Sequence, residues 1–292
     1  MGCAKKTPEE LTCCRLSFCF IFLVFCLLIA SATSANAQKT IINKLSPEEI
    51  QQIGNLVFKN ECASKDENLI AWNEGENFLS LGIGHFIWYP ARGKKTFIGS
   101  FAKFIEYAKN SGEKVPAWLD KVPFPACPWQ SRSSFLKAQN DRRLIELKEF
   151  LMRTKSTQAA FIIKRLEEAL PLILRHVSEE SREKIAFQIN RLISTPSGVY
   201  VLADYTNFKG LGITASEYYQ GKGWGLLQVL EGMRDKNEEP NAIREFARSA
   251  NDVLEKRVKN SPVGHNEQRW LLGWKQRINS YINQEEKVCL QK

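Results

Sequence analysis

Residues 69–89 read LIAWNEGENFLSLGIGHFIWY and differ in character from the rest of the chain. Two runs rich in β-forming apolar and aromatic residues flank the polar, turn-like residues 73–77. This pattern predicts a short hairpin or a small sheet. Gly82 and Gly84 suit a tight hairpin that passes close to backbone or to a ligand, and a simple β-bulge explains them equally well.

A helix is predicted directly upstream of this hairpin. Ser46 is a good N-cap residue, Pro47 suits the first helical position, and Glu49 completes a capping-box pattern. Apolar residues at helical spacing then continue to about Glu61. A carboxylate at a helix C-terminus faces the negative end of the helix dipole, so we expect the pKa of Glu61 to be raised. A raised pKa suits a general acid, although a solvated Glu at a frayed helix end is the plainer interpretation.

The remainder of the chain is predicted to be helical. Apolar residues recur at steps of three and four in six stretches: 134–153, 156–176, 179–194, about 224–235, 241–259 and 266–284. Pro171 is expected to kink or end the second of these helices. Residues 199–208 are almost continuously apolar, which leaves helix and strand equally open. The fold class is therefore mainly α (α+β), with one small β element in a single domain over residues 38–292.

The N-terminus has the pattern of a secretory signal. Basic residues precede the apolar run 16–32, and Ala35-Asn36-Ala37 resembles a cleavage site. We therefore expect residues 1–37 to be removed and the protein to be periplasmic or secreted, with no stable membrane span after cleavage. The alternative is an uncleaved anchor, for which the run is short, because a bilayer crossing takes about 20 apolar residues.

Composition and charge limit the classes of partner. With 43% hydrophobic and 25% charged residues, the chain is typical of a folded globular protein. Lys and Arg number 41 against 32 Asp and Glu, which favours a polyanion: nucleic acid, anionic lipid or an acidic cell-wall polymer. No nucleic-acid-binding module is recognisable, and export argues against such a partner.

Cysteine and histidine usage predicts no metal site and no cofactor. Beyond the signal, the chain has only Cys62, Cys127 and Cys289, which allow at most one disulfide and leave its pairing open. Three histidines in the whole chain and wide cysteine spacing do not match a zinc-binding pattern.

An ordered set of residues around the hairpin resembles the phage-type lysozymes. That family has an acid closing the first helix, a second acid in a hairpin, and a Thr or Ser six residues later, before I-G-x-G-H. Glu61, Glu74, Ser80 and the run 82–85 stand in this order. The gap from Glu61 to Glu74 is longer than is usual in the family, and its second acid is more often Asp.

The resemblance implies a fold and a chemistry. The fold would be lysozyme-like, with a helical insertion at about 90–195 that has no counterpart in a minimal phage lysozyme. Glu61 would protonate the leaving oxygen of a glycosidic bond, and Glu74 with Ser80 would position the attacking water. His85 would order the hairpin through a hydrogen bond. The strings LGIGHFIWYP (81–90) and GWGLLQVL (223–230) would mark an exported bacterial branch of this superfamily.

Further residues are candidates for contacts with sugar. Aromatic faces stack on sugar rings, and polar side chains near the two acids or in the C-terminal half can bind hydroxyl groups. The candidates are Trp72, Asn73, His85, Trp88, Tyr89, Tyr205, Asn207, Trp224 and Gln228. The aromatic residues of the hairpin fit a hairpin core equally well. Asp204, Tyr205, Asn207 and Lys209 are polar residues in an apolar stretch, and they form either a structural network or a cleft wall.

Residues 225–228, GLLQ, are also similar to a segment of lytic transglycosylases related to goose-type lysozyme, which nominates Glu217 as an alternative acid. The favoured function is an exported glycosidase that cleaves the glycan strands of peptidoglycan. Two alternatives stay open. One is a lytic transglycosylase that uses Glu61 alone, and the other is a non-catalytic module on the same fold that binds the cell wall or a protein.

Overall fold

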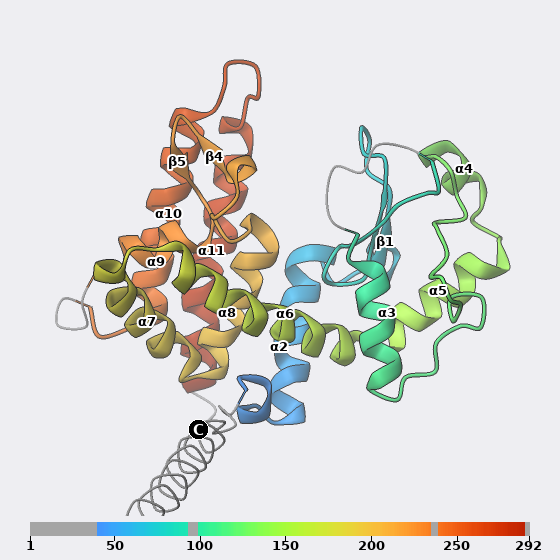
Figure 1. Cartoon of the computed structure of the whole chain (residues 1–292), viewed down its shortest axis with the longest axis horizontal. Coiled ribbons are helices and arrows are strands. Elements are labelled where there is room, and N and C mark those ends of the chain that lie inside the picture. The colour runs from blue at the N-terminus through green and yellow to red at the C-terminus, as the bar shows by residue number, and fades with distance from the viewer. Residues whose placement is uncertain (1–39, 93–98, 235–238, 290–292) are drawn as a thin grey trace, which may run out of the picture. The chain divides into compact units, whose positions relative to one another are not determined.

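The computed structural model describes residues 40–92, 99–234 and 239–289, with side chains described through Asn283. The predicted signal, residues 1–37, lies outside the described part. Residues Ile41–Lys292 form one compact unit that is mainly helical, as the sequence predicts (Figure 1). Among the residues described, none of the helices combines the length and the apolar character that crossing a bilayer requires.

Helices and short strands follow one another along the unit. The helices are η1 (Ile42–Lys44), α2 (Pro47–Cys62), η2 (Asp66–Leu69), α3 (Phe101–Asn110), α4 (Arg132–Lys137), α5 (Arg142–Arg153), α6 (Lys155–His176), α7 (Glu179–Ile193), α8 (Pro196–Lys209), η3 (Ala215–Glu217), α9 (Leu226–Gly232), α10 (Ala242–Asn260) and α11 (Gln268–Cys289). The strands are β1 (Ile70–Ala71), β2 (Leu79–Leu81), β3 (Phe86–Trp88), β4 (Tyr218–Tyr219) and β5 (Lys222–Gly223).

Helix α2 begins where its capping signals predict. The Ser46 hydroxyl accepts a hydrogen bond from the Glu49 amide at 3.2 Å, and the Ser46 amide donates to the Glu49 carboxylate at 2.8 Å. The helix ends at Cys62, and Ala63 follows in the left-handed conformation with φ 52°. Glu61 therefore lies in the last turn of α2.

Helices α2 and α6 pack against each other in the middle of the unit. Figure 1 shows them between two groups of elements: the small sheet with α3 to α5, and helices α7 to α11. Gly54 allows the close approach, because a Cβ there would lie 3.0 Å from the Ala159 Cβ. Pro171 does not end α6, which continues to His176. Pro171 is exposed, so water can replace the backbone hydrogen bond that proline removes.

The predicted hairpin is present and carries a third strand. The antiparallel sheet has the order β1-β2-β3, and Ser80 of β2 lies opposite Ala71 of β1 and Ile87 of β3. Gln158 of α6 holds the turn that follows β2, because its buried side-chain oxygen accepts a hydrogen bond from the Ile83 amide at 2.8 Å. The sheet is thereby fixed to the helix that packs on α2.

Residues 199–208, for which the sequence left helix and strand open, are helical. Residues 199–208 belong to α8, which begins at the N-cap Thr195 and contacts α2, α6 and α7. The stretch 134–153 divides into α4 and α5, and Asp141 caps α5 by accepting a hydrogen bond from the Arg143 amide at 2.8 Å. Within 90–195, α3 contacts β3 and α6, and α6 contacts α2 and α8, so these helices contribute to the core.

Candidate active site

Glu61 is the carboxylate on which separate parts of the chain converge. Its side chain is only 8% exposed. One oxygen, Oε1, accepts hydrogen bonds from Arg277 Nη2 of α11 at 2.5 Å and from Asn207 Nδ2 of α8 at 3.2 Å. The other oxygen, Oε2, lies 3.4 Å from Nδ1 of His85 in the turn between β2 and β3. The carboxylate is thus oriented by side chains from two helices and from the small sheet.

The electrostatic surroundings of Glu61 reverse one prediction. Burial by itself raises the pKa of this carboxyl, but the charges of Arg277 and His85 and the hydrogen bonds from Arg277 and Asn207 outweigh it, so the pKa is lowered. The expectation of a raised pKa is therefore wrong. It considered only the helix dipole, which amounts to about half an elementary charge, whereas the structure adds a full cation in contact.

Arg277 is itself held by a second buried acid. Its Nε and Nη2 atoms donate to the two carboxylate oxygens of Asp204 at 2.9 and 2.8 Å, and Asp204 has no exposed side-chain surface. The Tyr281 hydroxyl donates to Asp204 Oδ2 at 2.5 Å. Asn60 Nδ2 donates to Asp204 Oδ1 at 3.2 Å and to the Tyr200 hydroxyl at 2.8 Å. This network fixes the last turn of α2 to α8 and α11.

The G-x-G-H run places His85 through tight backbone geometry. Gly82 has φ +68°, and a Cβ there would lie 2.2 Å from Oε1 of Gln158. A Cβ at Gly84 would lie 2.3 Å from the Phe86 ring. His85 follows with φ 45°, in the left-handed region that non-glycine residues rarely adopt. Its side chain is 39% exposed, whereas that of its partner Glu61 is 8% exposed.

The other two members of the predicted catalytic set lie differently. Glu74 is exposed in the turn between β1 and β2, and Ser80 is buried at the centre of β2 with 6% exposure. Among the described residues, no hydrogen bond or ion pair joins either side chain to Glu61. The structure therefore brings Glu61, His85 and Asn207 together and leaves Glu74 and Ser80 outside that contact.

The aromatic candidates of the hairpin belong to its core. Trp72, Trp88 and Tyr89 are 5%, 4% and 7% exposed. Trp72 Nε1 donates to the Glu76 carbonyl at 2.8 Å, and Trp88 Nε1 donates to the Pro125 carbonyl at 2.9 Å. These rings pack on neighbouring aromatic side chains and present little surface to a sugar. Asn73 is exposed, and its amide donates to the Glu76 side chain at 3.0 Å.

Three candidates in the C-terminal half are buried or form hydrogen bonds within the protein. Tyr205 is fully buried and donates to the Trp224 carbonyl at 2.9 Å, and Trp224 itself is 5% exposed. Gln228 accepts from the Gly225 amide at 3.0 Å and donates to the Gly212 carbonyl at 3.0 Å.

Glu217, the alternative acid, is likewise engaged. It accepts hydrogen bonds at 3.0 Å from the backbone amides of Ile213 and Thr214, and another at 2.8 Å from the Thr214 hydroxyl, which together make it a cap of η3. Its Oε2 atom is therefore already supplied with donors.

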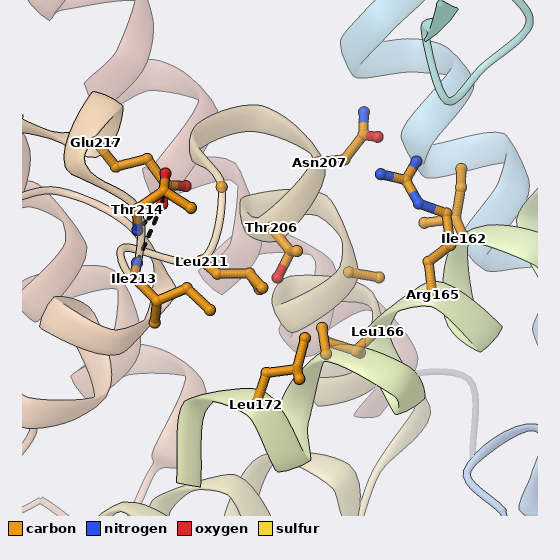
Figure 2. Close-up of a pocket in the computed structure, with 13 residues that line it drawn as sticks. Ile162, Arg165, Leu166, Leu172, Thr206, Asn207, Leu211, Ile213, Thr214 and Glu217 are labelled. Atoms are coloured by element: carbon orange, nitrogen blue, oxygen red, sulfur yellow. Dashed lines mark hydrogen bonds between the residues drawn. The ribbon is translucent and has the colours of Figure 1, made fainter. Parts of the chain in front are cut away.

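A pocket adjoins the Glu61 contacts and shares Asn207 with them. Figure 2 shows Asn207 and Arg165 at one end of this pocket, Thr206 near its middle, and Thr214 and Glu217 at the other end. Arg277 was not singled out in the sequence analysis. Arg277 lies 216 residues from its partner Glu61, so no local spacing connects them.

The chemistry available at Glu61 follows from these contacts. A buried carboxylate that is hydrogen-bonded on one oxygen and lies beside an imidazole on the other is a group that can take part in proton transfer. No family model, characterised protein or solved structure shows a significant match to this chain.

Proposed function

We propose that the protein cleaves the glycan strands of peptidoglycan, with Glu61 as the group that transfers the proton. The observation that carries the proposal is the arrangement of this carboxylate. Arg277 and Asn207 hold one oxygen, and the other oxygen faces the half-exposed His85. Oε2 lies beside the His85 imidazole and is the oxygen that we assign to proton transfer with the leaving group. The phage-lysozyme-like order of the residues in 61–85 agrees with this role.

The position of Glu74 favours a route that uses one acid. Glu74 is exposed and forms no described contact with Glu61, so a water held between the two acids has no support from their contacts. In the route with one acid, protonated Glu61 gives its proton to the glycosidic oxygen, and the C1–O bond breaks. The 6-hydroxyl of the same sugar then attacks C1 and returns its proton to the Glu61 carboxylate. The product is a 1,6-anhydro end, and the enzyme regains its starting state.

The deciding experiment measures soluble fragments released from purified peptidoglycan. We expect wild type to release them, Glu61→Gln to release none, and Glu146→Gln, which alters a partly exposed glutamate paired with Arg142, to behave as wild type. Mass spectrometry of the ends separates the routes, because anhydro ends identify transglycosylation and reducing ends identify hydrolysis. Undiminished release by Glu61→Gln would refute the role of Glu61. Absence of release by wild type, with sedimentation on the polymer retained, would instead identify a binding module.

A further inference from the structure

The pocket beside Glu61 has the form of a ligand site. It encloses about 350 Å³ between α6, α8 and residues 210–217. Most of its wall is apolar, formed by Ile162, Leu166, Ala169, Leu172, Leu211 and Ile213. Leu172 is 40% exposed although it is a large apolar side chain. Such a wall favours an occupant with small apolar groups, because covering it removes apolar surface from water.

A cation without an ionic partner lies at one end of the pocket. Among the described residues, no carboxylate forms an ion pair with Arg165. Desolvation lowers the pKa of its guanidinium, and the charge of Glu168 opposes that shift. Glu168 lies instead 3.5 Å from Lys164, the preceding residue. Arg165 is exposed to solvent where it lines the pocket, and a guanidinium without a carboxylate partner can bind an external anion through two parallel hydrogen bonds.

Two further polar groups line the pocket, Thr206 near its middle and Asn207 at the same end as Arg165. The hydroxyl of Thr206 is buried and has no hydrogen-bond partner, which is uncommon for a buried polar atom and leaves it available to a ligand. Asn207 lines the pocket while its amide also binds Glu61. The carboxylate of Glu217 lies at the far end and is hydrogen-bonded to the backbone there, as Figure 2 shows. The pocket is therefore cationic at one end and apolar along its length.

We propose that this pocket binds the carboxylate end of a short peptide with small apolar side chains, such as an alanine-rich dipeptide. The carboxylate lies on Arg165, a peptide group bonds the Thr206 hydroxyl, and the methyl groups cover Leu166 and Leu172. Two sources supply this chemistry: a peptide attached to the glycan strand, and a free peptide. The attached source rests on the proposed function, since the glycan must then occupy the site at Glu61. The binding itself does not depend on cleavage.

The first test uses acetyl-alanyl-alanine and its C-terminal amide, which have the same shape but differ in charge. Calorimetric titration of the purified full chain should show the acid binding at least tenfold more tightly than the amide. Arg165→Gln should abolish that preference. Lys164→Gln should retain it, because Lys164 is the adjacent cation of α6 but does not line the pocket. Equal binding of acid and amide by wild type, or no binding of either at millimolar concentration, would overturn the proposal without involving any variant.

The second test separates the two sources. Wild type and Arg165→Gln are sedimented with peptidoglycan and with the same glycan stripped of its peptides. Loss of binding by the variant to the peptide-bearing polymer alone identifies the attached peptide. Equal sedimentation of both proteins, with the dipeptide preference intact in wild type, identifies a free peptide. A failure of glycan cleavage would leave the dipeptide titration unchanged, so the two proposals fail separately.

Discussion

Replacing Arg277 with methionine tests whether Glu61 is held by charge. The change leaves the Glu61 side chain, 8% exposed, and the Asp204 side chain, 0% exposed, without their shared cation. Removing one partner of a buried ion pair costs about 3–5 kcal/mol. Because Arg277 serves two carboxylates, we expect the free energy of unfolding at pH 7 to fall by about 4–5 kcal/mol. In a chain of this size, that loss lowers Tm by about 8–20 °C.

The pH dependence of this loss of stability tests whether charge is its cause. In wild type the lowered pKa of Glu61 contributes stability above the unfolded-state pKa of about 4.3, and this contribution is lost as the pH falls through the folded-state pKa. In Arg277→Met, burial is no longer opposed by the arginine, so Glu61 takes up a proton more readily. The difference in unfolding free energy between the two proteins should therefore shrink from pH 7 to about pH 4.

Urea unfolding followed by circular dichroism at pH 7 and pH 4 measures both quantities. Arg142→Met is the matched control, because Arg142 pairs with Glu146 at 2.9 Å but its side chain is 92% exposed. An exposed pair of this kind contributes less than about 0.5 kcal/mol. A loss below about 1 kcal/mol for Arg277→Met at pH 7, or an equal loss at both pH values, would refute the electrostatic account of Glu61.

Three further predictions concern the stability that Glu245 provides, the hydrogen bond between Gln158 and Ile83, and the pH dependence of activity. Burial raises the pKa of Glu245, but hydrogen bonds from Arg248 and Arg234 hold it at about 2. Glu245→Gln should therefore lower the free energy of unfolding by about 2–3 kcal/mol at pH 7 and by much less at pH 2. A loss of stability that does not depend on pH would contradict this. Gln158→Leu leaves the Ile83 amide without its acceptor, and urea unfolding should show a loss of about 1–3 kcal/mol, against no change if the sheet is held without this bond. Since the pKa of Glu61 is lowered, kcat/KM for glycan cleavage should rise about tenfold for each unit of pH lost between 7 and 5, whereas a flat profile would exclude Glu61 as the acid.

Local signals account for what the sequence predicts well. The capping box of α2 lies within four consecutive residues, 46–49. The turn after β2 depends on backbone conformations that glycine favours. Both features can therefore be predicted from a few neighbouring residues. Residues 199–208 were ambiguous for a physical reason. Helix α8 contacts several other helices and is buried around most of its circumference, which removes the alternation between apolar and polar residues.

The rest depends on contacts between distant parts of the chain. Arg277 neutralises Glu61 across 216 residues, and that contact, which the sequence does not indicate, decides the direction of the pKa shift. The tryptophans of the hairpin were assigned to sugar or to the core with equal support. A tryptophan in a hairpin is expected both in a sugar-binding cleft and in a core, so the sequence around Trp72 and Trp88 does not distinguish these roles. Their burial in the structure does.

The span between Glu61 and Arg277 also has a consequence for the order of biosynthesis. A ribosome adds about 5–20 residues per second, so the 216 residues that separate the pair take roughly 10–40 s to make. During that interval the nascent chain already contains Glu61 and His85, but not the guanidinium that fixes the carboxylate. The arranged site therefore comes into existence only after α11 has been synthesised, and an interrupted polypeptide that stops before α11 lacks it.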